Sequence, residues 1–313
     1  MGKNLTAGEY DFINIRLTDV SGGDMPGDKL VIEYQHQKKA ELLFGEIMKH
    51  CQTKGTIKKL VISLFGGSGV GKSEIAALLK YGFTAQGTGA YVLSGDNYPW
   101  RIPRENDAER LTTYRQAGIR ALNDGSLATS ENMRALSSLI SQNLDCERYQ
   151  RTIYPFLTEY QLAGEKALAG YLGSDTEIDF AYVNSIITGF KNRERTIYLK
   201  RMGNSLTELS YEAIDFSDTE VLIIEWTHGG SYFLKGIDFK VLLNSSPKET
   251  LEHRKKRNRD KGVDSAFTTI VLDLEQKLLS TQAGKADIIL TNQAEIIDYQ
   301  RYLEMTECLD GEN

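Results

Sequence analysis

The sequence predicts an α/β fold, a three-layer sandwich with a parallel central sheet and a helical insertion. Five short runs rich in Val, Ile and Leu are each long enough for one strand. Helical segments separate these runs, and continuous apolar strands are typical of a parallel sheet that is buried on both faces. A glycine-rich run follows the first strand directly. The predicted strands are 60–65, 90–94, 221–225, 239–243 and 286–290.

Residues 1–55 are expected to form an N-terminal extension that consists of an arm and a helix. The first 30 residues are polar and rich in turn signals, which favours either a small hairpin or a loose arm. Apolar side chains at helical spacing predict a helix over 34–53. The main domain is expected over 56–313, with a mostly helical insertion at about 105–172.

The glycine-rich run 66–73 fits the pattern G-x-x-x-x-G-K-[ST] of the phosphate-binding P-loop, or Walker A motif. A predicted strand precedes it, and a helical pattern from Glu74 follows it. Such a junction points backbone N–H groups and the positive end of the helix dipole at one anion. We therefore expect a P-loop NTPase fold that binds ATP, with Lys72 on the phosphates and Ser73 on Mg²⁺. The predicted phosphate contacts are Gly67, Ser68, Gly69, Val70, Gly71, Lys72 and Ser73.

Two acidic residues follow predicted strands at the sheet edge where open α/β folds bind ligands. Asp96 comes directly after the second strand, and Glu225 ends the third. We expect Glu225 to organise Mg²⁺ with Ser73 and Asp96 to accept a proton from an attacking hydroxyl. The alternative is that Asp96 caps a turn and Glu225 pairs with a lysine. His228 lies close to Glu225 in sequence, and substrate contact is expected there rather than proton transfer.

The densest basic run extends from Arg254 to Lys261 and ends at Gly262. Such a run is usually a solvated helix face. It also follows a core strand and ends at a glycine that can act as a hinge, which favours a lid over about 252–264 that closes on phosphates. No aromatic side chains are interleaved with the basic ones, so nucleic-acid binding is not favoured. The predicted phosphate contacts in the lid are Arg254, Arg257 and Arg259.

Composition agrees with an ordinary globular enzyme. The 313 residues carry a net charge of −6 and are 41% hydrophobic, so the sequence does not indicate nucleic acid or an anionic membrane as a partner. The three cysteines, Cys51, Cys146 and Cys308, lack metal-site spacing and fit a reducing compartment. No apolar run approaches a membrane span, and the polar start lacks the core of a signal peptide. A cytoplasmic location is expected.

The order of these parts resembles the phosphoribulokinase/uridine kinase family of P-loop kinases. In particular, 94–98 is similar to the family's S-x-D-x-[FY] segment, in which the aspartate is the base. The strand that ends at Glu225 resembles the family's strand that ends in E-G, although Trp226 replaces the glycine here. Other matching segments are the P-loop, 178–180, 196–198, the lid at 259–264, 275–276 and 286–289.

The resemblance implies an enzyme that transfers the γ-phosphoryl group of ATP to a hydroxyl of a small metabolite. Asp96, Lys72 and Glu225 would carry the chemistry. Uridine kinases have a histidine in the acceptor hairpin where this chain has none, so uridine is not supported. Lys200 and Arg201 favour an anionic acceptor instead. The acceptor contacts expected are Tyr98, Arg101, Asp179, Tyr198, Arg201 and His228.

Two other functions stay open at this point. The segment 94–97 also resembles the D-G-D-N segment of adenylylsulfate kinases. A regulatory P-loop ATPase, with the helical insertion as its protein-binding part, is a different class of function. A GTPase would need an N-K-x-D motif, which is absent. The expected partner is a small-molecule acceptor, and a homo-oligomer is left open.

Overall fold

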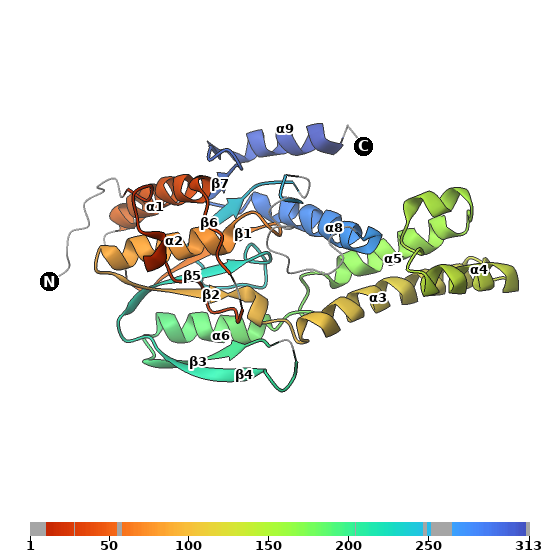
Figure 1. Cartoon of the computed structure of the whole chain (residues 1–313), viewed down its shortest axis with the longest axis horizontal. Helices are drawn as coiled ribbons and strands as arrows, with labels where there is room; N and C mark the ends of the chain where they lie inside the picture. The colour runs from red at the N-terminus through yellow and green to blue at the C-terminus, as the bar shows by residue number, and fades with distance from the viewer. Residues whose placement is uncertain are drawn as a thin grey trace. The chain divides into compact units, whose positions relative to one another are not determined.

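A computed structural model describes residues 11–27, 29–54, 58–203, 205–246, 249–251 and 265–310 (Figure 1). The chain divides into two compact units, which we call the sheet unit and the helical unit. The sheet unit comprises Met1–Tyr98, Asp179–Arg257 and Leu279–Asn313, and the helical unit comprises Pro99–Ile178 and Asn258–Leu278. Within the described ranges, no helix is both long and apolar enough to cross a membrane.

The sheet unit contains a six-stranded sheet that is parallel except for its last strand, in the order β2-β5-β1-β6-β7-β8. This arrangement confirms the predicted α/β fold with its parallel central sheet. All five predicted strands are present, and the sequence missed only the short antiparallel edge strand β8. The strands are β1 (Leu60–Gly66), β2 (Gly89–Ser94), β5 (Thr219–Trp226), β6 (Phe239–Leu243), β7 (Ile288–Leu290) and β8 (Ile296–Ile297).

Both faces of this sheet are buried, as the continuous apolar runs predicted. Alternate residues of β1 pack with helices α1 (Tyr34–Lys54) and α2 (Lys72–Ala85) in one core cluster. Phe65, on the opposite face, packs with the last turn of α8 (Ala266–Ala283) and with α9 (Tyr299–Asp310). The sheet therefore holds the P-loop between two helical layers.

The N-terminal arm is packed against the sheet unit. Its described part, 11–27 and 29–33, contains a single helical turn, η1 (Leu17–Asp19), and no strand. Phe12 is fully buried, and its ring meets the edge of Phe44 of α1 with 5.5 Å between centroids. Phe44 in turn contacts Phe83 of α2 at 5.0 Å. Arm, α1 and α2 thus share one core.

A helix and a separate hairpin complete the sheet unit. Helix α6 (Phe180–Lys191) leads into β3 (Thr196–Arg201), which pairs antiparallel with β4 (Ser210–Asp215). Most of β4 is exposed, so its sequence lacks the apolar pattern that marks a core strand. A 3₁₀ turn, η2 (Gly95–Asn97), follows β2.

The helical unit is built on two closely packed helices, α3 (Pro103–Asp124) and α5 (Leu157–Tyr171). Two glycines allow the close approach. A Cβ at Gly118 would lie 2.4 Å from the ring of Tyr160, and one at Gly164 would lie 2.8 Å from the ring of Tyr114. A glycine of each helix therefore packs against an aromatic ring of the other helix. The unit also contains α4 (Ser130–Ser141) and η3 (Arg148–Thr152).

We predict that Gly164→Ala destabilises the protein by about 1–3 kcal/mol, because the added methyl group overpacks a buried contact with Tyr114. Gly170→Ala in the same helix is the matched control. No atom lies within 4 Å of its added Cβ, so alanine there should be neutral or stabilise by up to about 1 kcal/mol. Urea unfolding of both variants measures the difference, and equal stabilities would contradict the close crossing of α3 and α5.

Candidate nucleotide and acceptor site

The P-loop connects β1 to α2 through glycines that adopt unusual backbone angles. Gly69 and Gly71 have φ values of 78° and 93°, a left-handed region that favours glycine. Lys72 begins α2, and its Nζ donates hydrogen bonds to the carbonyl oxygens of Gly66 at 3.0 Å and Gly67 at 2.9 Å. The ammonium group therefore lies over the loop whose N–H groups are expected to bind phosphates.

A buried carboxylate joins the P-loop helix to two strands. The Ser73 hydroxyl donates to Glu225 Oε2 at 3.3 Å, and the Ser94 hydroxyl donates to Glu225 Oε1 at 2.6 Å. The parallel register explains this meeting, because Ser94 and Glu225 are paired positions on the neighbouring strands β2 and β5. The sequence predicted that Ser73 and Glu225 act together, and the structure brings them into contact.

These oxygen atoms fit a magnesium ion. Mg²⁺ prefers hard oxygen ligands and usually takes only one or two from the protein, the others being phosphate and water oxygens. Ser73 and Glu225 supply such oxygens beside the P-loop. In the described part of the chain, no group of three or more His, Cys, Asp or Glu side chains could hold a metal by itself. A site completed by nucleotide phosphates agrees with both observations.

Asp96 lies at the carboxyl end of β2, in the turn η2, and its side chain is exposed. The turn is shaped by Trp226, which is 2% exposed. A Cβ at Gly95 would lie 1.9 Å from Cγ of Trp226, so only glycine fits beneath this ring. Trp226 stands where the phosphoribulokinase/uridine kinase family has glycine. Here it has a packing role, because it supports the turn that carries Asp96.

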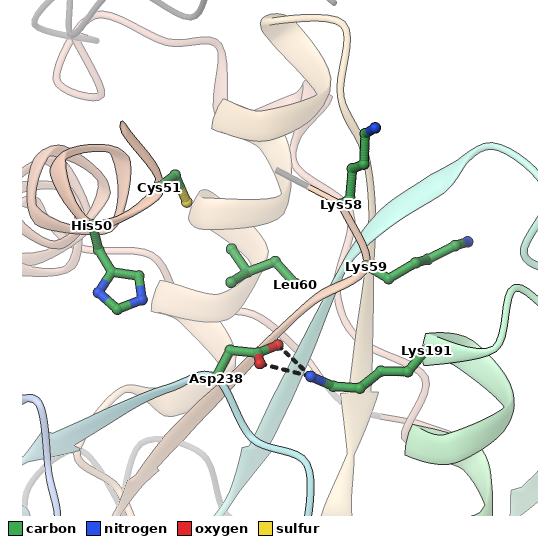
Figure 2. A pocket seen from close by; sticks show the side chains of 7 residues that line it. All are labelled: His50, Cys51, Lys58, Lys59, Leu60, Lys191 and Asp238. Atoms are coloured by element: carbon green, nitrogen blue, oxygen red, sulfur yellow. Dashed lines mark hydrogen bonds and ion pairs between the residues drawn. The ribbon is translucent and has the colours of Figure 1, made fainter. Parts of the chain in front are cut away.

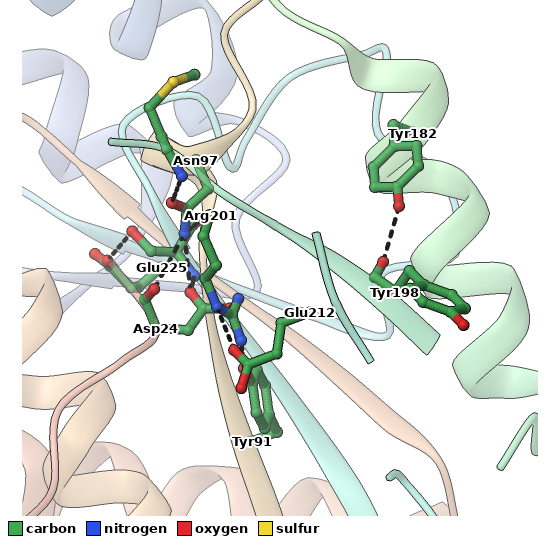
Figure 3. Close-up of polar contacts among 10 residues, drawn as sticks. Asp24, Tyr91, Asn97, Tyr182, Tyr198, Arg201, Glu212 and Glu225 are labelled. Atoms are coloured by element: carbon green, nitrogen blue, oxygen red, sulfur yellow. Dashed lines mark hydrogen bonds and ion pairs between the residues drawn. The ribbon is translucent and has the colours of Figure 1, made fainter. Parts of the chain in front are cut away.

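The N-terminal arm supplies a residue of this site that sequence reasoning missed. Figure 3 shows Asp24 beside Tyr91, Asn97 and Arg201. Its carboxylate accepts hydrogen bonds from the backbone N–H of Ser94 at 2.7 Å, Tyr91 at 3.1 Å, Asn97 at 3.2 Å and Arg201 at 2.7 Å. Burial raises the pKa of Asp24, and the hydrogen bonds from Ser94 and Arg201 oppose that rise. In the sequence, Asp24 lies within the turn-rich first 30 residues, where no local pattern marks it as a site residue.

The two cations that suggested an anionic acceptor both have acidic neighbours. Arg201 donates to Asp24, and also to Glu212 at 2.9 Å. Lys200 is buried, and burial lowers the pKa of its ammonium group while the nearby charge of Asp179 opposes that change. Because these charges are already balanced within the chain, they give no argument for an anionic acceptor.

The remaining predicted acceptor residues are spread over several elements. Asp179 caps α6 by accepting from the N–H of Tyr182 at 2.9 Å. Tyr98 is fully buried, and burial raises the pKa of its hydroxyl, for which the described residues offer no hydrogen-bond partner. Its ring stacks with that of Tyr182 at 6.1 Å. Tyr198, by contrast, is 59% exposed on β3.

His228 and Arg101 are the last two residues that were predicted to contact the acceptor. His228 is buried, and its ring contacts Trp226 edge to face at 5.6 Å. Arg101 belongs to the helical unit, where it donates to Tyr171 at 3.1 Å and faces Glu109 at 3.7 Å. The predicted lid residues Arg254, Arg257 and Arg259 lie outside the described residues.

A cavity of about 260 Å³ lies at the amino end of β1, away from the P-loop (Figure 2). Lys191 and Asp238 form an ion pair there, with 2.6 Å between Nζ and Oδ1. None of the predicted site residues lines this cavity, so it is separate from the candidate site. Its lining residues are His50, Cys51, Lys58, Lys59, Leu60, Lys191 and Asp238.

Comparison with known proteins gave a sequence relative but no family assignment. The chain is 36% identical over 261 residues to a bifunctional α-galactosidase/sucrose kinase of Mediterraneibacter gnavus. The match covers 83% of this chain and 23% of the relative, so the chain corresponds to less than a quarter of that protein. No protein-family model matches the chain.

Solved structures similar to the chain include three that are named as kinases of small molecules. A phosphoribulokinase from Rhodobacter spheroides matches with 15% identity and a TM-score of 0.43, over 75% of this chain and 71% of that one. A possible uridine kinase from Bacillus stearothermophilus matches with 15% identity and a TM-score of 0.39, over 81% and 97%. A D-glycerate 3-kinase from Cryptococcus neoformans matches with 12% identity and a TM-score of 0.45, over 85% and 99%.

We predict that Asp24→Asn lowers the free energy of unfolding by about 3 kcal/mol, because it removes one partner of a buried ion pair. Glu212→Gln removes the other carboxylate on the same guanidinium and is the matched control. The side chain of Glu212 is 59% exposed, against 7% for Asp24, so its loss should cost about 1 kcal/mol or less. Urea unfolding at neutral pH compares the two, and equal losses would contradict the central position of Asp24.

Proposed function

We propose that this chain is a P-loop kinase that transfers the γ-phosphoryl group of ATP to a hydroxyl of a small neutral sugar. The observation that carries the proposal is the contact between Ser73 and Glu225 beside the P-loop, with Asp96 exposed at the end of the neighbouring strand. One carboxylate is thus buried among hydroxyl groups, where it can organise Mg²⁺. The other is accessible, as a base that meets a substrate hydroxyl must be.

In the proposed reaction, the acceptor oxygen bonds to the γ-phosphorus while the bond from that phosphorus to the β–γ bridging oxygen breaks. ADP departs, and the hydroxyl proton passes to a carboxylate oxygen of Asp96. Lys72 and the P-loop N–H groups hold the phosphates and stabilise their charge. Mg²⁺, when bound through Ser73 and Glu225, supplies further charge stabilisation. We assign Arg254, Arg257 and Arg259 to a lid over the donor.

The choice of acceptor rests on the sequence relative and on the charge balance of the site. The name of the relative combines α-galactosidase and sucrose kinase. Since this chain contains a P-loop, which serves triphosphate chemistry, we assign the matched part to the kinase activity. A neutral acceptor such as sucrose agrees with the pairing of Arg201 by Asp24 and Glu212, whereas adenylylsulfate would need an unpaired cation. Cys51 and Cys146 are buried as thiols and not joined in a disulfide, which agrees with the proposed cytoplasmic setting.

The acceptor can be identified by a direct assay. We expect ADP formation to be stimulated by a neutral mono- or disaccharide, with mass spectrometry showing a product that has gained one phosphoryl group. Glycerate, uridine and adenylylsulfate should give little stimulation. Preference for adenylylsulfate would contradict the neutral-acceptor proposal. Release of inorganic phosphate alone, on addition of a protein partner, would favour a regulatory ATPase.

Substitution of the two carboxylates separates their proposed roles. Asp96→Asn should lower kcat about 10²–10⁴-fold, the usual contribution of a general base, and leave the Kd of ATP·Mg nearly unchanged. Glu225→Gln should instead raise the Mg²⁺ concentration needed for half-maximal rate. Steady-state kinetics over a Mg²⁺ titration, with calorimetric ATP binding, measures both effects. If Asp96→Asn raises the Mg²⁺ requirement and Glu225→Gln lowers only kcat, the assigned roles are exchanged.

A further inference from the structure

A chain that binds ATP as proposed also needs a site for the nucleotide base. We infer the position of that site here, and the inference rests on the proposed function. The P-loop follows β1, whose neighbours in the sheet are β5 on one side and β6 on the other. The side of β5 and β2 holds the carboxylates Glu225 and Asp96, which serve the metal and the acceptor. In the proposed site, the opposite side, over the ends of β6 and β7, remains for the base of a nucleotide whose phosphates lie on the P-loop.

The loops that follow β6 and β7 are joined and contain polar groups. The N–H of Asn244, the first residue after β6, donates to the carbonyl oxygen of Leu290 at the end of β7 at 2.8 Å, so the two loops start side by side. Ser245 is only 5% exposed, and the described residues give its hydroxyl no hydrogen-bond partner. A buried hydroxyl without a partner costs free energy, and a bound ligand can remove that cost. Asn292 lies two residues beyond β7.

Helix α1 of the N-terminal extension reaches this same region. The ring of His36 lies so close to Gly71 that a Cβ at Gly71 would be 2.6 Å from it. Nδ1 of His36 accepts a hydrogen bond from the N–H of Glu33 at 3.0 Å, which fixes the ring. The first turn of α1 therefore packs directly on the P-loop.

One turn further along α1, Lys39 contacts the loop after β7. This lysine is 2% exposed, and its Nζ donates to Oδ1 of Asn292 at 2.8 Å. Burial lowers the pKa of Lys39 to about 8, and the charge of Glu249 opposes that change. A buried ammonium group is costly unless it is hydrogen-bonded or paired with an opposite charge, and Lys39 has Asn292 Oδ1 as an acceptor and the charge of Glu249 nearby. The hydrogen bond also fixes the orientation of the Asn292 amide.

We propose that Lys39 positions Asn292 to bind the base of the nucleotide. Lysine only donates hydrogen bonds, so the amide atom that faces it must be oxygen. The amide nitrogen of Asn292 is then left as a donor, and the hydrogen bonds of the described residues include none from it. Purine bases offer acceptor atoms such as N7, which an asparagine amide can bind. Lys39 thus acts through Asn292, as a positioning residue supplied by the N-terminal extension.

The test compares ATP with inorganic tripolyphosphate, which occupies the P-loop but has no base. Calorimetry on the full chain gives Kd for both probes with the wild type, Lys39→Met and Asn292→Asp. Both variants should weaken ATP binding about five- to ten-fold, the contribution of one hydrogen bond, and change tripolyphosphate binding less than about two-fold. Asn292→Asp keeps an oxygen for Lys39 and removes only the amide donor.

Lys59→Met is the matched control, because Lys59 is also buried and hydrogen-bonded, through the carbonyl oxygens of Phe216 and Thr219. It lies just before β1, away from the P-loop, and should leave both affinities unchanged. If ATP and tripolyphosphate weaken together in the Lys39 and Asn292 variants, the damage is structural and the proposal is wrong. It is also wrong if neither probe weakens. A wild-type chain that binds neither probe would overturn the proposed kinase function itself.

Discussion

The candidate site depends on the hydrogen bonds that Glu225 accepts from Ser73 and Ser94. They join the carboxyl ends of β2 and β5 to the first turn of α2, and so fix the P-loop relative to the strand that precedes Asp96. A carboxylate with 4% exposure is tolerated because both of its oxygens have hydroxyl partners. The same bonds hold the oxygens that we propose for Mg²⁺ beside the P-loop, so one contact serves both packing and the proposed chemistry.

The N-terminal extension contacts both sides of this hydrogen-bonded group, at Ser94 and at the P-loop. Asp24 accepts from the backbone of Ser94, the residue whose hydroxyl also binds Glu225. His36 packs on Gly71, at the start of the helix that carries Ser73. Because the arm and α1 share their apolar core with α2, loss of the extension would expose that core as well as unpair buried charges. The extension is therefore part of the sheet unit's structure.

The sequence predicted the elements whose signals are local. A glycine-rich run between a strand and a helix identified the P-loop, and apolar runs identified β1, β2, β5, β6 and β7. Helix α1 was predicted over 34–53 and is found over Tyr34–Lys54. Strand β4 was missed because most of its side chains are exposed and show no apolar pattern, and β8 was missed because it has only two residues. The contacts of Asp24 with Arg201 could not be predicted, because they join residues 177 positions apart through the fold alone.

The cations on the acceptor side of the site have acidic neighbours within the chain. On the phosphate side, Lys72 lies over the P-loop and donates to the carbonyl oxygens of Gly66 and Gly67. On the acceptor side, Arg201 faces Asp24 and Glu212, while the charge of Asp179 acts on Lys200. An anionic acceptor would have to displace one of these carboxylates from its cation, and the free energy of that ion pair would be lost. A neutral hydroxyl compound avoids that cost, and the exposed carboxylate of Asp96 is the one that we propose as its base.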